Sequence, residues 1–339
     1  MGTVPASSAD GGLHVLVLGA GSAGKRHARN LRALGCTISA FDPRDDRLQE
    51  IAAEGAVTGL HTTLEAALAA DRYDGFMIAS PPVYHVPQVL QIVASQDRWI
   101  LCEKPLSITR AEAARLAPHA DRLLLAYTYR WWPPLLSFRR RLLAGEIGTV
   151  RNMRFVMSAH LADWHPWEKY QDFFMARRDL GGGALLDESH FVDLMLWMLG
   201  TPVRVFADVD RISDLDIDTD DNVDILAAYA NGARVNLHLD LIGRPHERRI
   251  TAIGSAGSLT YVYEENALRL SIGEAAPQIE SFTCERNEMF MGAAREFVGL
   301  MHGETPSLSC SVNDGIRVLT ILDACRASAA SGTAVTVPA

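Results

Sequence analysis

Short apolar runs alternate with amphipathic stretches over the first third of the chain. The apolar runs have the length of strands, and the stretches between them repeat apolar residues at helical spacing. Strands that alternate regularly with helices are typical of a parallel sheet. The pattern predicts strands over 13–18, 37–41, 75–79, 99–102 and 122–126, and helices over 45–54, 63–69 and 86–94.

The rhythm changes after residue 130. Two helices and then a run of strands indicate a second domain of the α+β type. The helices are predicted over 135–144 and 184–199, and the strands over 150–158, 203–209, 223–229, 234–240, 249–253 and 258–263. Helices over 288–301 and 312–328 close the chain, and the last of them is the candidate to pack back on the first domain.

The fold class is therefore α/β, in two domains. A chain of 339 residues exceeds the size at which one hydrophobic core usually stops growing. We predict a loose N-terminal tail over 1–12, a doubly wound Rossmann domain over 13–130, and an α+β domain over 131–339. The tail is rich in Ser, Ala and Gly and lacks the basic and apolar regions of a signal peptide.

Composition and charge exclude several classes of partner. Hydrophobic residues make up 48% of the chain and charged residues 22%, which is ordinary for a globular protein. The net charge is -9 without a basic block, so nucleic acids and anionic membranes are poor partners. No apolar run approaches the ~20 residues that span a bilayer. The 5 Cys are scattered and odd in number, which favours reduced thiols and a cytoplasmic location.

A glycine-rich turn follows the first predicted strand. Gly19, Gly21 and Gly24, with Ser22 and Ala23 between them, fit the G-x-G-x-x-G pattern, and a helical stretch over 27–34 follows. Such glycines allow a tight turn and close approach of a pyrophosphate, which the helix N-terminus then stabilises. We therefore predict a dinucleotide site at this turn.

The acid that ends the second strand indicates which dinucleotide is bound. Asp42 lies near the position expected for a carboxylate that hydrogen-bonds the adenosine ribose, although an Asp before Pro43 also starts turns. A carboxylate at that place repels the 2′-phosphate of NADP, so we predict NAD. Arg44 is the residue that could instead meet this phosphate, which keeps NADP open.

Lysine is rare in this chain. Of 32 Lys and Arg residues, only positions 25, 104 and 169 are lysine. Lys104, in Glu103-Lys104-Pro105, follows a predicted parallel strand, and ligands bind at the carboxyl ends of such strands. Lysine releases a proton where arginine does not, so Lys104 is a candidate proton carrier. The alternative is a surface ion pair between Glu103 and Lys104.

A run of three glycines at 181–183 leads into the apolar helix 184–199. That helix is apolar nearly all round, so we expect it to be buried. Asp187, His190 and Asp193 are spaced so that neighbouring pairs share a helix face. Buried polar groups cost free energy unless they are satisfied, which indicates either a ligand site or a structural histidine bonded to two acids.

Aromatic and polar residues interleave in Asp163-Trp164-His165-Pro166-Trp167, as they do in a carbohydrate pocket. Packing at a domain junction explains them equally well. His160, Asp163 and His165 lack a tight third-ligand motif, so we predict no metal.

Taken together, the motifs resemble the Gfo/Idh/MocA family of sugar and cyclitol oxidoreductases. The resemblance extends from about residue 13 to residue 337. It rests on the turn 19–24, Ser80-Pro81-Pro82 with His85, Glu103-Lys104-Pro105, Tyr129-Arg130, residues 145–148, and the glycines 181–183 with Asp187, His190 and Asp193. It implies a nicotinamide cofactor, hydride transfer at a secondary carbinol, a small sugar or polyol as substrate, and a homo-oligomer, dimer or tetramer, joined through an open-faced, largely antiparallel sheet.

The resemblance also implies roles for individual residues. Lys104 and His190 handle the hydroxyl proton, and Asp187 holds the imidazole of His190 in one tautomer. The expected cofactor residues are Gly19, Gly21, Ser22, Ala23, Gly24, Asp42, Arg44, Ser80, Pro81, His85, Glu103 and Lys104, and the expected substrate residues are Lys104, Arg130, Trp164, Asp187 and His190.

The chain departs from the family pattern next to the histidine. The family separates the acid from the histidine by four residues and has a glycine two before the histidine, whereas Asp187 lies three before His190 with Glu188-Ser189 between them. Asp187 and Glu188 are therefore both candidates to orient the imidazole.

Two other functions fit the same fold. One is an enzyme that recycles tightly bound NAD, as in glycoside cleavage; the other is a dinucleotide-binding regulator without catalysis. The presence of both Lys104 and His190 argues against the regulator. Net NADH formation from a free polyol distinguishes the dehydrogenase from both.

Overall fold

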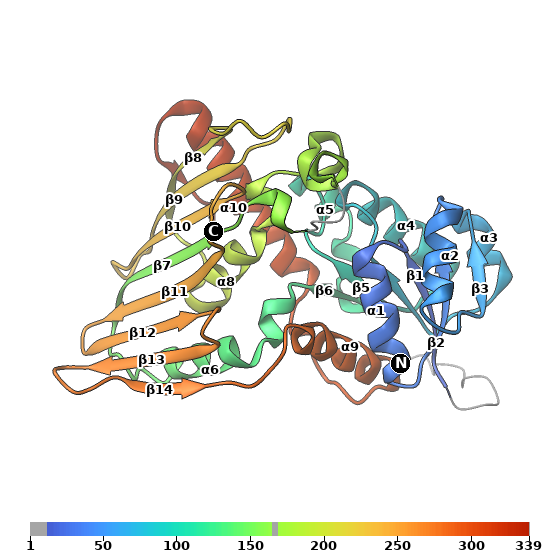
Figure 1. Ribbon diagram of the computed structural model, residues 1–339, viewed down its shortest axis with the longest axis horizontal. Coiled ribbons are helices and arrows are strands. Elements are labelled where there is room, and N and C mark those ends of the chain that lie inside the picture. The colour runs from blue at the N-terminus through green and yellow to red at the C-terminus, as the bar shows by residue number, and fades with distance from the viewer. Residues whose placement is uncertain (1–11, 165–168, 339) are drawn as a thin grey trace. The chain divides into compact units, whose positions relative to one another are not determined.

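The computed structural model describes residues 12–164 and 169–338, which form two compact units (Figure 1). The first unit holds the described residues up to Ser107, with Ala111–Ala126 and Phe290–Asn313. The second unit holds Ile108–Arg110, Tyr127–Met289 and the residues from Asp314 onward. The chain thus passes between the units several times, which the single boundary predicted at residue 130 does not describe.

The first unit is built on a six-stranded sheet of order β3-β2-β1-β4-β5-β6, in which every pairing is parallel. Its strands are β1 (His14–Leu18), β2 (Thr37–Phe41), β3 (Gly59–His61), β4 (Gly75–Ile78), β5 (Trp99–Glu103) and β6 (Leu123–Ala126). Its helices are α1 (Ser22–Ala33), α2 (Asp45–Ala53), α3 (Leu64–Ala70), α4 (His85–Ser95), α5 (Arg110–Ala114) and α9 (Asn287–His302). The first residue of α5 and the first three residues of α9 belong to the second unit. The strand order reverses between β1 and β4, which is the switch point where such sheets bind ligands. The predicted doubly wound sheet is confirmed.

The sequence pattern missed the short elements β3 and α5 of this unit and placed the start of α1 too late. β3 has three residues and pairs only with β2, so it is too short to show an alternation. Helix α1 starts at Ser22, five residues before the predicted helical stretch, because its first turn is the glycine-rich segment itself.

Helix α9 packs in the first unit. Phe297 and Met301 of α9 lie so close to Gly75 of β4 that a Cβ there would come within 2.8 Å and 2.5 Å of them. Helix α10 (Val312–Ser331) belongs to the second unit from Asp314 onward. The expectation that the last helix packs back on the first domain stays a prediction. The two helices are similarly apolar, and periodicity alone does not say which sheet each covers.

The second unit is built on a nine-stranded sheet of order β14-β13-β12-β11-β7-β10-β9-β8-β15. Its strands are β7 (Val150–Ser158), β8 (Arg204–Asp210), β9 (Asn222–Ala228), β10 (Arg234–Asp240), β11 (Glu247–Gly254), β12 (Gly257–Val262), β13 (Ala267–Ile272), β14 (Gln278–Ser281) and β15 (Val335–Thr336). β7 and β10 pair in parallel and the other neighbours are antiparallel, as the family resemblance implied. β13, β14 and β15 were not predicted.

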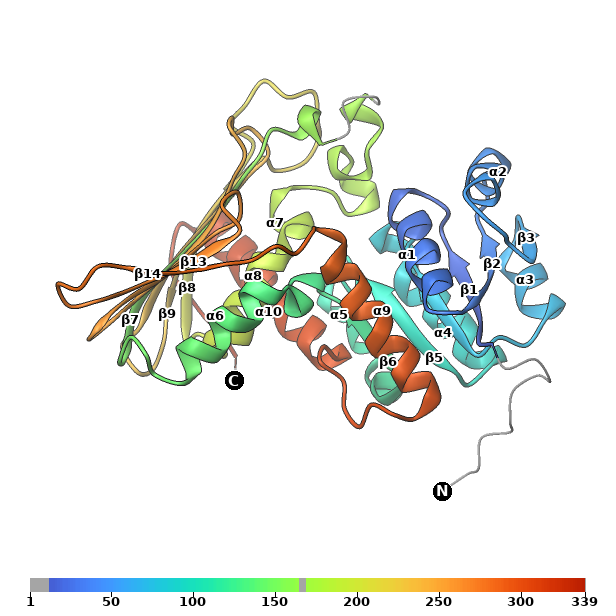
Figure 2. The same cartoon turned by 60° about the horizontal axis from the view of Figure 1, so that its bottom comes forward.

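Helices of the second unit lie on one face of this sheet (Figure 2). They are α6 (Pro133–Leu143), α7 (Ala184–Asp187), α8 (Ser189–Leu199) and α10. Short 3-10 turns accompany the helices of both units at Pro82–Tyr84, Ala117–Arg122, Thr128–Trp131, Leu161–Asp163, Tyr170–Asp172, Phe174–Ala176 and Arg178–Leu180. On β10, Val235, Leu237 and Leu239 are buried against the helices, and Arg234 and Asn236 point to the open face.

Among the described residues, none of the helices combines the length and the apolar character that crossing a membrane requires.

A charged cluster lies on the open face of the second sheet. His238 of β10 hydrogen-bonds through Nδ1 to Asp224 (2.8 Å) and through Nε2 to Asp240 (3.0 Å). The hydrogen bond with Asp240, assisted by Asp224 and opposed by partial burial, raises the pKa of His238 to about 9. The folded protein therefore keeps this imidazole charged to a higher pH than the unfolded chain does.

We expect this cluster to weaken the fold at alkaline pH. Its stabilisation is complete below the unfolded pKa of 6.5 and is lost as the pH rises through about 9. Because the side chain is 35% exposed, solvent screening limits the effect to about 1 kcal/mol. Thermal unfolding at about pH 6 and about pH 9.5 should show a drop in Tm that is roughly 2–4 °C smaller in His238→Gln. Equal drops in the two proteins would contradict the assignment.

Candidate active site

Two of the three glycines in the turn after β1 are required by the chain itself. Gly19 has φ +91°, and a Cβ on it would lie 2.7 Å from the backbone nitrogen of Ser80. A Cβ on Gly24 would lie 1.8 Å from the carbonyl oxygen of Gly19. The turn therefore packs against the end of β4 and against its own helix with no space for side chains.

The middle glycine is not required by the chain. Gly21 is the N-cap of α1 with φ -72° and ψ -168°, which any residue adopts, and a Cβ on it would meet nothing within 4 Å. Helix α1 has no side-chain cap and no acidic residue in its first turn, so its first amides are directed at open space beside Gly21. A bare turn gains nothing from glycine here, whereas a pyrophosphate that approaches the backbone does. The residues present fit a dinucleotide.

Asp42 holds the turn in place from the end of β2. One carboxylate oxygen accepts from the amide of Ala20 (2.8 Å) and the other from the amide of Arg44 (2.9 Å), and the side chain is almost buried. The turn-starting role considered for Asp42 is therefore real, and it leaves lone pairs for a ribose hydroxyl. The Arg44 guanidinium is exposed and donates to both carboxylate oxygens of Asp46.

Lys104 sits in a loop that is fixed on both sides. The Glu103 carboxylate, at the end of β5, accepts from His27 Nε2 (2.8 Å) and from the Lys104 amide (3.1 Å). Burial opposes ionisation of Glu103, but the hydrogen bond and charge of His27, with Lys104, outweigh it and lower its pKa. The buried hydrogen-bond partner of Glu103 is thus His27, which no sequence pattern indicated.

His85 ties the same loop to the end of β4. Its ring is fully buried, with Nδ1 2.8 Å from the carbonyl oxygen of Pro105 and Nε2 2.8 Å from that of Ser80. The Ser80 hydroxyl donates to Gln88 (2.7 Å). His85, which was predicted to contact the cofactor, therefore holds the two loops that flank Lys104 and offers neither ring nitrogen to a ligand.

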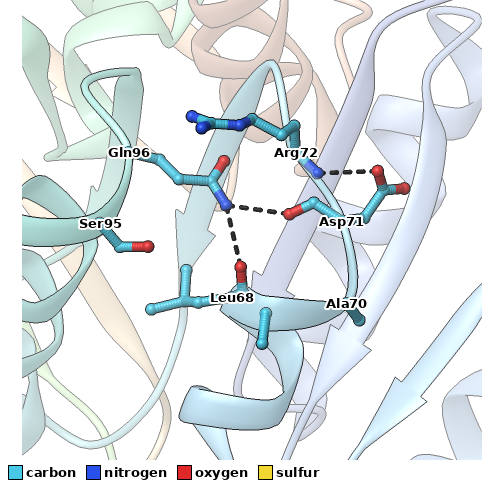
Figure 3. Close-up of a pocket in the computed structure, with 7 residues that line it drawn as sticks. Leu68, Ala70, Asp71, Arg72, Ser95 and Gln96 are labelled. Carbon is cyan, nitrogen blue, oxygen red and sulfur yellow. Dashed lines mark hydrogen bonds between the residues drawn. The ribbon is translucent and has the colours of Figure 1, made fainter.

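The pocket in Figure 3 lies at the amino ends of the strands of this sheet. Leu68, Asp71 and Arg72 precede β4, and Ser95 and Gln96 precede β5. The Gln96 amide donates to the carbonyls of Asp71 (2.9 Å) and Leu68 (3.3 Å), so it satisfies the chain itself (Figure 3). Ligands of open parallel sheets bind at the carboxyl ends of the strands, and this pocket is at the amino ends.

His190 lies in the second unit against two aromatic rings. Its ring centroid is 5.1 Å from that of Tyr129 and 5.6 Å from that of Tyr127, both edge-on. The Tyr127 hydroxyl hydrogen-bonds to Ser189 (3.1 Å). These contacts fix the plane of the imidazole, as proton transfer from a defined nitrogen requires.

The single helix predicted over 184–199 is interrupted beside His190. α7 ends at Asp187, Glu188 has φ -85° and ψ 18°, and α8 starts at Ser189. Asp187 and His190 therefore do not share one continuous helix face, and the spacing argument for their contact does not hold in its original form. Asp187 and Glu188 are both buried, at 3% and 6% exposure, so both remain candidates to orient His190.

The glycines before α7 position its first turn. Gly183 has φ +108°, and a Cβ on it would lie 2.5 Å from the Asp220 carboxylate. Asp220 accepts from the amide of Leu185 (2.8 Å), and its carbonyl accepts from the amide of Ala184 (2.9 Å). Asp220 was not recognised from the sequence, because it lies 35 residues away from Leu185.

Arg130 and Asp193 form a buried pair. The guanidinium donates to both carboxylate oxygens of Asp193 (2.9 and 2.6 Å) and lies 3.3 Å from Asp314. Arg130 was predicted to bind substrate; its side chain is 5% exposed and donates to a protein carboxylate, which favours a structural role, and the substrate role stays a prediction. Both carboxylate oxygens of Asp193 accept from Arg130 in this contact.

The aromatic stretch after Asp163 is only partly described. His165, Pro166 and Trp167 lie outside the described residues. The Arg244 guanidinium donates to both carboxylate oxygens of Asp163 (2.7 and 2.8 Å). The buried indole N–H of Trp164 has no hydrogen-bond partner in the described part of the chain. Trp164 stays a candidate substrate residue. In residues 12–164 and 169–338, no group of three or more His, Cys, Asp or Glu side chains is arranged to hold a metal ion.

Sequence reasoning missed a basic and aromatic cluster near His190. The Arg248 guanidinium lies over the Tyr263 ring, 4.0 Å from its centroid, and Tyr263 stacks on Trp132 at 5.9 Å. The Trp132 indole donates to the Tyr261 hydroxyl (2.6 Å). These residues come from β11, from β12 with the turn after it, and from the turn before α6, so the sheet topology alone brings them together.

Two family models match the chain, one in each half. Residues 13–129 match the oxidoreductase family with an NAD-binding Rossmann fold, and residues 135–260 match the GFO/IDH/MocA C-terminal domain.

Curated relatives and solved structures agree with these matches. D-xylose 1-dehydrogenase (NADP(+)) 2 of Haloferax volcanii is 27% identical over 88% of this chain and 91% of its own length. Inositol 2-dehydrogenase of Acidothermus cellulolyticus is 24% identical over 78% of this chain and 77% of its own. A levoglucosan dehydrogenase solved with NADH and levoglucosan has a TM-score of 0.85 at 19% identity, over 97% of this chain and 100% of that one. The last likeness shows the fold.

Proposed function

The chain belongs to the Gfo/Idh/MocA family of oxidoreductases and carries its NAD-binding Rossmann domain, and on that premise we propose that it is an NAD-dependent dehydrogenase of a sugar or cyclitol. The relatives named above act, by their names, on a pentose and on inositol. The observation that carries the proposal is the position of Lys104, at the carboxyl end of β5 in the sheet whose glycine turn stays open at Gly21.

The proposed reaction needs little from the protein beyond positioning and proton transfer. The bound nicotinamide supplies the hydride acceptor for a secondary carbinol carbon, or the donor in reverse. Lys104 and His190 take the hydroxyl proton as the carbinol becomes a carbonyl. Hydrogen bonds to Glu103 and His85 hold the loop that carries Lys104 in place. Edge-on contacts with Tyr127 and Tyr129 hold the imidazole ring of His190 in one orientation.

A screen of sugars, cyclitols and sugar acids with NAD and NADP tests the proposal. We expect net NADH formation, read as absorbance, with at least one free polyol. Turnover of a glycoside without net NADH would instead identify the enzyme that recycles its cofactor. Binding of NADH without turnover of any polyol or glycoside would identify the regulator.

We expect NAD to be preferred over NADP by at least about tenfold in kcat/KM. Asp42 repels a 2′-phosphate, and Arg44, the cation that could bind one, is held by Asp46. Asp46→Asn frees Arg44 and should raise kcat/KM with NADP, while the matched exposed change Asp45→Asn should not. A wild-type enzyme with the higher kcat/KM for NADP would overturn the preference.

We also propose that the chain forms a homo-oligomer through the open face of the second sheet. Leu226 of β9 is 53% exposed on that face, beside Phe206 of β8 and Asn236 of β10. Apolar residues in such a place usually mark an interface. Light scattering at micromolar concentration should report a dimer or tetramer, and Leu226→Asp should weaken it. A wild-type protein that is a monomer of 37.1 kDa in this measurement would refute the proposal.

A further inference from the structure

Arg248 of β11 is a half-buried cation enclosed by rings. Its guanidinium lies 4.0 Å from the centre of Tyr263 and donates to the His246 ring at 3.0–3.3 Å. Within residues 12–164 and 169–338, no carboxylate lies within ion-pair distance of it, unlike exposed arginines such as Arg244, Arg249 and Arg269, each of which pairs with a carboxylate. The charge of Arg248 is thus held by neutral partners.

Arg248 lies among charges of both signs, but few carboxylates act on its guanidinium. Partial burial, with Arg248 and Arg286, lowers the pKa of His246 to about 4, so His246 is neutral at physiological pH and accepts from Arg248. Glu188 is the carboxylate that acts on Arg248 through space, and Arg286 adds a second positive charge to the same neighbourhood. Glu264 accepts only from the Arg248 backbone amide. Asp163 and Asp240 act on the His246 ring, and Glu188 is the carboxylate that acts on the Arg248 guanidinium itself.

Arg248 is linked to His190 through Tyr129. The Tyr129 side chain interacts with the Arg248 guanidinium, and its ring lies edge-on to His190 at 5.1 Å. All three residues belong to the second unit. Tyr129 therefore contacts both His190 and Arg248.

We propose that Arg248 binds a carboxylate of the substrate and makes the enzyme selective for sugar acids over neutral sugars. The inference rests on the proposed function, because it names the substrate class of the same site. A planar guanidinium pairs with both oxygens of a carboxylate, and such a pair gains strength where water is partly excluded. A neutral sugar leaves the Arg248 guanidinium without a carboxylate at ion-pair distance.

The test compares each sugar acid with its neutral parent, and glucuronate with glucose 6-phosphate as the second source of an anion. The wild type should favour the carboxylate over the neutral parent by about 10²-fold in kcat/KM, as expected for a paired charge in a binding site. Arg248→Gln should lose most of this ratio, and Arg248→Lys should keep part of it. Arg249→Gln is the matched control, because Arg249 is exposed and pairs with Glu247 at 3.2 Å, and it should keep the ratio.

Direct binding separates this inference from the proposed function. Titration of the NADH complex with the sugar acid should show binding that weakens in Arg248→Gln and not in Arg249→Gln. Failure of every polyol to form NADH, with this Arg248-dependent binding intact, refutes the dehydrogenase and keeps the carboxylate site. Equal turnover of acid and parent, with no effect of Arg248→Gln, refutes the carboxylate site and keeps the dehydrogenase. Preference for glucose 6-phosphate over the sugar acids also refutes it.

Discussion

Lys104→Arg should reduce kcat by on the order of 10²- to 10⁴-fold, the range that a positioned proton carrier supplies. Arginine keeps the positive charge but does not release a proton at working pH. If Lys104 supplied charge alone, turnover and dinucleotide binding would both survive the change. The size of the loss in kcat therefore separates a structural cation from a proton carrier.

Affinity for NADH should change far less in Lys104→Arg. The turn at Gly21 and the carboxylate of Asp42 hold a different part of the cofactor, and neither depends on the Lys104 side chain. The measurements are kcat with the best substrate from the screen and a fluorescence titration with NADH on the same variant.

Lys25→Arg provides the matched control. Lys25 pairs with Glu50 at 2.8 Å on the surface of the first unit, and arginine can make the same ion pair. The control should retain wild-type turnover. A Lys104→Arg enzyme within a few-fold of wild type would refute the catalytic assignment.

The first unit could be predicted well because its signals are local. β1, β4 and β6 are apolar runs buried on both faces, and the glycine turn follows β1 within the sequence, so short windows contain the information. The rarity of lysine was also a useful signal. Lys25 is explained by Glu50 and Lys169 is exposed, which leaves Lys104 as the half-buried lysine that follows β5.

The contacts that position the site could not be predicted, because they join residues far apart in the sequence. His27 reaches Glu103 across 76 residues, and Arg130 reaches Asp193 across 63. The carboxylate partner of Arg130 could not be recognised for this reason, since in the sequence an arginine beside aromatic residues looks the same whether its partner is a ligand or a buried carboxylate. Helical spacing likewise did not reveal the break at Glu188, where the residues on both sides are equally apolar.

That break matters for the last prediction, which concerns the acid that orients His190. We expect Asp187 to be the positioning residue, so that Asp187→Asn reduces kcat by up to about 10⁴-fold, as loss of an orienting carboxylate does in hydrolytic triads. Glu188→Gln should cost less than about tenfold on a neutral polyol. The carboxylate of Glu188 interacts electrostatically with Arg248 and Tyr129, so we expect it to offset the positive charge of Arg248 rather than to orient His190.

A structural role for Asp187 predicts a different result from a positioning role. If Asp187 only stabilised the fold, Asp187→Asn would lower Tm and leave the kcat of the folded fraction and its pH profile unchanged. If Asp187 holds the imidazole in one tautomer and stabilises its protonated form, the variant should keep its Tm and NADH affinity, and the pH profile of kcat should move to lower pH as the pKa of His190 falls. Both variants should therefore be measured by thermal unfolding, NADH titration and a pH series. A larger loss and pH shift in Glu188→Gln would transfer the role to Glu188, and would mean that the short spacing before His190 changes which acid reaches it.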